Sequence, residues 1–122
     1  MVLGIDVATM AKANPPFMSG VPELLVLRLL SQQEMYGYEL VRAIRLTSEE
    51  AIVLAEGVVY PVLHGLEQQG VLRSKERLVG GRTRIYYTVT AKGRRRLATL
   101  AEEWDRLNLG IRSIMGGVPC LS

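Results

Sequence analysis

The chain has 122 residues and a formal net charge of +3, and hydrophobic residues make up 48% of it; this length suits one domain, and so many apolar residues in a small domain predict self-association. One histidine, one cysteine and scattered carboxylates form no catalytic or metal-ligating set at a recognisable spacing, so we expect no enzyme activity, no cofactor and no bound metal. No apolar run is long enough to span a bilayer, and the first residues lack the basic start of a secretion signal, so we expect a cytoplasmic protein.

The N-terminal part is expected to hold an extension followed by a buried helix. Residues 1–19 form the extension, which Pro15 and Pro16 separate from the domain that follows. The helix is expected over residues 23–31, which are almost entirely apolar, with Ser19 as its N-cap. A connector then leads to a second helix.

The second expected helix is amphipathic. It follows the connector over residues 32–36, and its apolar residues recur at helical spacing while basic residues lie on its other side. The apolar residues are Leu40, Val41 and Ile44, and the basic ones are Arg42 and Arg45.

The third expected helix has an apolar stripe and an opposite face that is open to a ligand. The stripe of Val59, Val62, Leu63 and Leu66 has the spacing i, i+3, i+4, i+7, and Gly70 ends the helix. At about 100° per residue, the opposite face falls on a second set with Tyr60 at its edge. That second set is Gly57, Pro61, His64 and Gln68.

A β-hairpin is expected next. Residues 71–79 alternate as a strand, Gly80-Gly81 forms a turn, and residues 84–89 return. One face of the first strand holds Arg73, Lys75 and Arg77 and the other Leu72 and Leu78, while Ile85, Tyr87 and Val89 of the return strand are expected to face inward. Helices followed by a hairpin form a winged helix-turn-helix, in which the third helix enters the major groove and the hairpin lies along the DNA backbone. We therefore expect this α+β, mainly α fold over residues 20–90.

The hairpin begins a basic segment. Residues 73–96 hold nine basic side chains and one acidic one, a net charge of +8, whereas residues 1–72 have a net charge of −4 and the remainder −1. A concentrated basic segment beside an acidic remainder is typical of a contact with a polyanion, because Lys and Arg neutralise phosphates and release condensed counterions. This pattern predicts a nucleic-acid partner, although a solvated basic hairpin would give the same composition.

The last expected helix spans residues 91–116, with Thr90 as its N-cap and a tail over residues 117–122 behind it. Arg94 to Arg96 oppose the helix dipole, so they need a compensating anion, such as a DNA phosphate, unless solvent covers them. Further along, apolar residues alternate at spacings of three and four, the seam of a coiled coil, and predict a homodimer. The seam comprises Leu97, Leu100, Ala101, Trp104, Leu107, Ile111, Ile114 and Met115.

Motifs in a fixed order extend this interpretation to a family. They are LLVLRLL at residues 24–30, YGYEL at 36–40, EGVVYPVLHGLE at 56–67, and GGR at 80–82 with YYTVTAKG at 86–93. In this order they closely resemble the PadR family. The resemblance implies a winged-helix repressor that is dimeric through its C-terminal helix and leaves operator DNA when a small aromatic compound binds. The short C-terminal part resembles the compact branch of the family.

The candidate site residues follow from both lines of argument. For DNA they are Tyr36, Gly57, Tyr60, Pro61, His64, Gln68, Lys75, Arg77, Arg82 and Arg84. Since the third helix offers no arginine for guanine, we expect few base contacts and a contribution from DNA shape, on an operator that is palindromic. Tyr60 could instead pack on the hairpin, and His64 could be an ordinary surface side chain.

The resemblance also implies an effector site. In the compact branch, a tryptophan in this region can stack planar compounds at the dimer centre, and Trp104, with Leu100 and Leu107, resembles it. Simple packing in the interface is the alternative for Trp104. A second class of function stays open as well, because a winged helix can be a protein-interaction module without direct DNA binding; the charge of residues 73–96 favours DNA.

Overall fold

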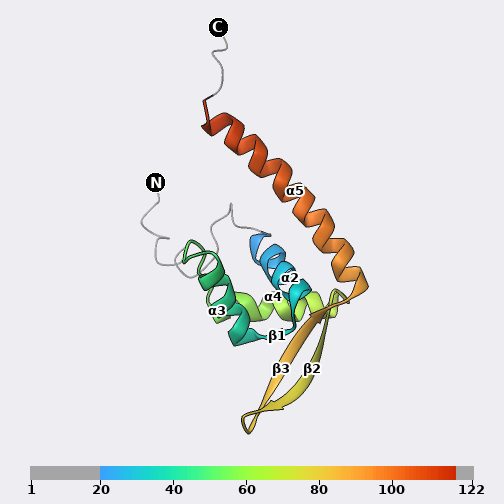
Figure 1. Ribbon diagram of the computed structural model, residues 1–122. Coiled ribbons are helices and arrows are strands. Elements are labelled where there is room, and N and C mark those ends of the chain that lie inside the picture. Colours follow the sequence, from blue (N-terminus) through green and yellow to red (C-terminus); the bar gives the residue numbers. More distant parts are fainter. Residues whose placement is uncertain (1–19, 118–122) are drawn as a thin grey trace, which may run out of the picture.

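The computed structural model describes residues 20–117. The expected N-terminal extension, all but the first residue of the expected tail, and Cys120 lie outside this range. Along the chain (Figure 1) the elements are α2 (Val21–Gln32), β1 (Met35–Tyr36), α3 (Gly37–Thr47), α4 (Glu56–Gln68), β2 (Leu72–Val79), β3 (Arg82–Val89) and α5 (Ala91–Met115).

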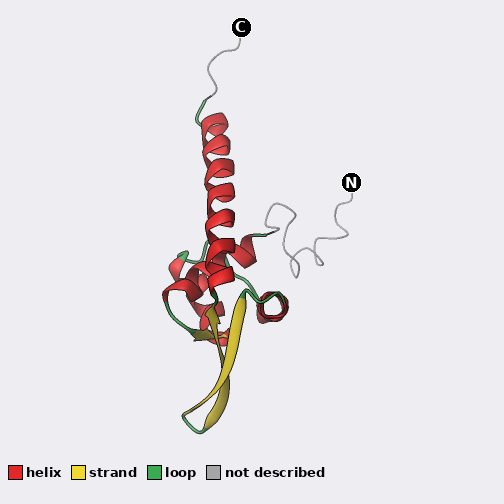
Figure 2. Ribbon diagram, turned by 90° about the vertical axis from the view of Figure 1, so that its right-hand side faces the viewer, coloured by secondary structure: helices red, strands yellow, loops and turns green. Residues whose placement is uncertain are grey.

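The elements form a helical body with two projections. The body consists of α2, α3 and α4, the β2–β3 hairpin extends from one side of it, and α5 extends in the opposite direction (Figure 2). The sheet has the order β1-β3-β2, and both pairings are antiparallel. This arrangement confirms the predicted winged helix-turn-helix with a long C-terminal helix. The β2–β3 hairpin is called the wing below.

The core lies where the three helices of the body meet. Val26 and Leu27 of α2, Leu40 of α3, and Val59 and Leu63 of α4 each have an exposed fraction of 0%. The residues of α3 and α4 belong to the apolar stripes predicted from helical spacing, and those of α2 belong to its predicted apolar run. Burying one such side chain contributes about 1.5–3 kcal/mol, so the stripes fix the orientation of α4 and with it the face that stays in solvent.

The end of α4 and the start of α5 are joined by a compact set of backbone contacts. At Gly70, which has a φ of 77°, the chain leaves α4, and the N–H of Val71 donates to the carbonyl of Leu66 over 2.9 Å, the pattern of a Schellman motif. Thr90 caps α5 as predicted, because its side chain accepts from the N–H of Gly93. A Cβ on Gly93 would lie 2.3 Å from the carbonyl oxygen of Val71. A glycine is therefore required at this crossing.

Two local predictions near the sheet and α2 are wrong. The expected connector contains the short strand β1, which pairs Met35 with Tyr87 and Tyr36 with Tyr86. The N-cap of α2 is Gly20 rather than Ser19; Gly20 has a φ of 87° and makes no side-chain cap. A two-residue strand has too little sequence to show alternation, and a glycine cap has no side chain to recognise.

The predicted burial of β3 is also partly wrong. Tyr87 is buried as expected, but Ile85 is 39% exposed, and Tyr86, which alternation directs outward, is only 8% exposed. β1 covers Tyr86, because Tyr36 is its partner in the sheet. Ile85 pairs with Glu76, one position further along the hairpin than the residues that β1 pairs with.

Candidate nucleic-acid interface

The free face of α4 is the one that helical spacing predicts. Gly57, Pro61, His64 and Gln68 are all exposed, while the opposite stripe is buried except for Val62, which is half-buried. Pro61 lies inside the helix and has no N–H to donate to the carbonyl of Gly57, one turn earlier. The first two turns of α4 therefore offer solvent a backbone acceptor and little side-chain bulk.

Tyr60, at the edge of this face, holds α4 against the start of α3. A Cβ on Gly37 would lie 2.3 Å from Cε1 of Tyr60, so the ring occupies the space that the glycine leaves. Burial, with a smaller contribution from Glu56, raises the pKa of the Tyr60 hydroxyl. Tyr60 thus packs against the start of α3, and it also lines a groove together with residues of β3, the hairpin strand that the sequence suggested as an alternative partner.

A groove separates α4 from the wing. It has a volume of about 310 Å³ and is lined from α4 by Tyr60 and His64, and from β3 by Thr83, Arg84 and Ile85. Tyr36 and Gly37 line its remaining side. The groove brings together four predicted DNA-binding residues, which come from three different elements: Tyr36, Tyr60, His64 and Arg84.

Two arginines and two tyrosines form a stacked cluster at the base of the wing. The rings of Tyr36 and Tyr86 meet edge to face, with centroids 5.4 Å apart. The guanidinium carbon of Arg84 lies 4.3 Å from the centroid of Tyr36, and that of Arg77 lies 4.7 Å from the centroid of Tyr86. Each such cation–π contact contributes about 0.5–1 kcal/mol at an exposed site. The cluster therefore fixes both guanidinium groups.

Glu34 adds a carboxylate to one side of this cluster. Its carboxylate pairs with the guanidinium of Arg77, and its Oε1 lies 3.7 Å from Nζ of Lys75. Nothing in the sequence signals this contact, because Glu34 and Arg77 are 43 residues apart in the chain. Two of the predicted DNA-binding cations thus already have an acidic partner within the protein.

Arg82 and Arg84 are in a different situation. Arg82 is exposed and follows the Gly80-Gly81 turn, while Nε of Arg84 is buried and has no hydrogen-bond partner within residues 20–117. Neither arginine forms an ion pair with a carboxylate in this part of the chain. Their charge is available to an outside anion.

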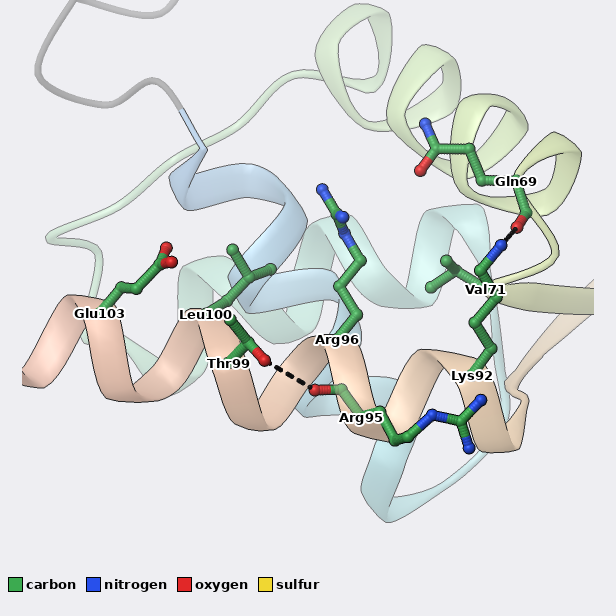
Figure 3. A pocket seen from close by; sticks show the side chains of 8 residues that line it. All are labelled: Gln69, Val71, Lys92, Arg95, Arg96, Thr99, Leu100 and Glu103. Carbon is green, nitrogen blue, oxygen red and sulfur yellow. Dashed lines mark hydrogen bonds between the residues drawn. The ribbon is translucent and has the colours of Figure 1, made fainter.

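Arg95 and Arg96 at the start of α5 line a hollow of about 780 Å³, together with Gln69, which caps the end of α4 (Figure 3). Arg95 and Arg96 point apart in this view, and Lys92 donates to the carbonyl of Gln69 over 2.7 Å. Arg96 pairs with Glu23 of α2, and this hydrogen bond raises the pKa of the guanidinium. The compensating anion expected here is therefore an internal carboxylate in the case of Arg96, rather than a phosphate.

The predicted seam on α5 divides into two parts. Leu97 and Leu100 are half-buried against the core of the body, whereas the residues beyond them lie on the part of the helix that projects from it (Figure 1). Their exposed fractions are 37% for Trp104, 53% for Leu107, 48% for Ile111, 66% for Ile114 and 79% for Met115.

A hollow of about 220 Å³ lies at the point where the two parts meet. Leu100, Trp104 and Leu107 line it together with Val21 and Leu24 of α2. The three residues predicted for an effector thus share one hollow. Glu103 is also part of its wall, which the sequence did not indicate. Within residues 20–117, no helix is long and apolar enough to cross a membrane, and no cluster of histidine, cysteine and carboxylate side chains suits a metal ion.

Fold and surface together define a winged helix-turn-helix protein whose last helix, α5, has an apolar seam that is exposed over residues 104–115. Residues 26–99, more than half of the chain, match the family model described as "Transcriptional regulator PadR-like family". The chain therefore belongs to the PadR-like family of transcriptional regulators, as its motifs predicted.

Individual relatives agree with this assignment. The chain is 33% identical over 101 residues to the transcriptional regulator Rv3488 of Mycobacterium tuberculosis, covering 83% of this chain and 89% of that protein. A Streptococcus transcriptional regulator of known structure is 32% identical, with a TM-score of 0.71 over 84% of this chain and 99% of that one. The PadR-like regulator BC4206 from Bacillus cereus has a TM-score of 0.73 at 26% identity, over 84% and 99% of the two chains.

Proposed function

We propose that this PadR-family regulator binds double-stranded operator DNA as a homodimer, with α4 in the major groove and the wing along the backbone. The observation that supports this most strongly is the exposed face of α4 beside Arg82 and Arg84 of the wing, which form no ion pair within residues 20–117. The N-terminal half of that face has little side-chain bulk, so a DNA edge can approach the helix closely. An adjacent cationic hairpin is suited to the phosphates that flank the groove.

Base reading in this proposal depends on few side chains. His64 and Gln68 are the exposed residues of this face that have hydrogen-bonding side chains, and neither is the arginine that most often reads guanine. Discrimination between operators then comes from a small number of contacts and from DNA shape. In this proposal, Arg82 and Arg84 contact phosphates, and these contacts supply most of the affinity.

The second copy is proposed to pack along the exposed part of α5. A helix with a continuous exposed apolar seam needs a partner, and the same helix of a second subunit fits it by two-fold symmetry. A two-fold dimer places its reading helices on two half-sites about 34 Å apart, one turn of DNA, so the operator is expected to be palindromic.

Control of DNA binding is proposed to reside in the hollow around Trp104. This hollow lies between α5, which joins the subunits, and α2, which belongs to the DNA-binding body. A planar aromatic compound stacked on Trp104 would therefore contact both parts and could change their relative position. We propose a repressor that leaves DNA when such a compound binds.

The experiment that tests DNA binding starts from a pool of randomised duplexes. The protein selects duplexes from the pool, and the affinity for a selected and for an unselected duplex is then measured at several salt concentrations. Binding that weakens steeply with salt, together with enrichment of a palindromic sequence, is the expected result. Affinity that does not fall with salt would instead favour a winged-helix module that binds proteins.

A further inference from the structure

Four basic residues of the wing fall into two pairs: Lys75 and Arg77 lie beside Glu34, whereas Arg82 and Arg84 do not. Arg77 and Arg84 are partners across the β2–β3 pair, so they lie on the same face of the hairpin. Arg77 meets the carboxylate of Glu34, whereas Arg84 meets the ring of Tyr36. Like charges directly opposite each other destabilise a sheet, and the Glu34 carboxylate reduces this repulsion.

We propose that Glu34 is the internal counter-ion of the wing: its single negative charge offsets part of the charge of Arg77 and Lys75, so that Arg82 and Arg84 make the main contact with the DNA backbone. The proposal rests on the DNA-binding function proposed above and assigns a new role within it. Glu34 thereby sets the affinity for DNA below the value that the basic residues of the wing would otherwise give.

The short strand β1 restricts where the Glu34 carboxylate can lie. Its side chain is 24% exposed, and the next residue, Met35, is 9% exposed and pairs with Tyr87 in the sheet. On the other side, the ring of Tyr86 already orients Arg77. Because both partners are held before they meet, their pairing costs less side-chain entropy than an ion pair between free surface side chains.

The consequence for DNA binding follows from counterion release. Each phosphate neutralised by the protein contributes about 0.9 to the slope of log affinity against log salt. The group of Glu34, Lys75 and Arg77 has a net charge of +1, and a phosphate that approaches either cation also meets the carboxylate. Arg82 and Arg84 have no such competitor within residues 20–117.

The first test compares how tightly two Glu→Gln variants bind an unselected duplex. Glu34→Gln removes the counter-ion, and Glu76→Gln removes the same charge from an exposed carboxylate of β2 that forms no ion pair within residues 20–117. We expect Glu34→Gln to bind more tightly than wild type and with a steeper salt dependence. An extra slope of about 0.9 makes its advantage about threefold larger at ~50 mM than at ~200 mM salt for each subunit.

The control variant and the wild type distinguish a failure of the counter-ion proposal from a failure of the proposed DNA-binding function. Glu76→Gln is expected to stay close to wild type in both affinity and slope. If Glu34→Gln and Glu76→Gln behave alike, or if Glu34→Gln binds more weakly at every salt concentration, the proposal is wrong while the DNA-binding function stands. If the wild type itself shows no salt-dependent binding, the proposed function is wrong and the counter-ion role with it.

A second test does not require a variant at Glu34 to fold. Arg77→Gln and Arg84→Gln make the same chemical change at two cross-strand partners, each of which also loses one contact with a tyrosine ring. Arg84→Gln is expected to lower the salt slope by about one per subunit, and Arg77→Gln by clearly less. Equal losses, or a larger loss from Arg77→Gln, would overturn the proposal.

Discussion

The carbonyl oxygen of Val71 lies 2.3 Å from the place where a Cβ of Gly93 would be. This contact joins the start of the wing to the start of α5, so it connects the proposed DNA-binding and dimerising parts of the molecule. The side chain of Thr90 reinforces it by donating to the carbonyl of Gly70 over 2.7 Å. A small change at this crossing is therefore expected to affect the whole protein.

Gly93→Ala is expected to destabilise the protein by about 2 kcal/mol, because the new methyl group meets backbone that cannot move aside easily. Gly65→Ala is the matched control, because Gly65 lies in the middle of α4 and a Cβ there would meet no other atom within 4 Å. This variant is expected to be neutral or stabilising by up to about 1 kcal/mol. Urea unfolding followed by circular dichroism measures both. Equal stabilities for the two variants would contradict the close packing at Gly93.

The exposed seam of α5 predicts that a single charge separates the subunits. Ile111→Glu places a carboxylate in the proposed interface and is expected to give a monomer in sedimentation experiments, because an unpaired buried charge is strongly unfavourable. Leu109→Glu is the control, since Leu109 is 64% exposed on the same helix but lies off the seam. A monomeric Leu109→Glu, or a dimeric Ile111→Glu, would argue against this interface.

The free face of α4 predicts a loss of sequence discrimination without a loss of general affinity. His64→Ala and Gln68→Ala remove side-chain contacts to base edges, so each is expected to weaken binding to a selected duplex by about 1–3 kcal/mol and to leave binding to an unselected duplex nearly unchanged. The measurement is the ratio of the two affinities. A uniform loss on both duplexes would identify these residues as phosphate contacts instead.

Trp104 is the single tryptophan of the chain, so its fluorescence reports on the hollow directly. We expect planar aromatic compounds to quench it with saturation, and Leu107→Ala to weaken this effect because Leu107 lines the same hollow. A panel of such compounds without any saturable quenching would remove the effector from the proposal and leave DNA binding untouched.

Local periodicity was sufficient to predict the helices and the exposed face of α4. Val59 and Leu63 are buried and His64 is exposed, as spacing at 3.6 residues per turn requires. The cap at Thr90 and the turn at Gly80-Gly81 were also predictable, because each depends on residues that are neighbours in the chain. The order of these elements was enough to define the fold.

Contacts between distant segments were not predictable in the same way. The sequence contains no sign that Glu34 meets Arg77 or that Glu23 meets Arg96, because the pairing depends on how β1 and α2 pack in three dimensions. The predicted alternation of buried and exposed side chains along β3 is also wrong at Ile85 and Tyr86, because burial there depends on where the wing leaves the helical body. The net charge of residues 73–96 therefore counts the basic residues of this segment, but it cannot show which of them have an acidic partner within the protein.

The most direct test of the central claim is the salt dependence of DNA binding by the wild-type protein and by Arg84→Gln. If α4 and the wing form a DNA interface, wild-type affinity falls steeply between ~50 and ~200 mM salt, and Arg84→Gln weakens binding and lowers the slope by about one per subunit. Affinity that is independent of salt, or an Arg84→Gln variant that binds like wild type, would contradict this account of the interface.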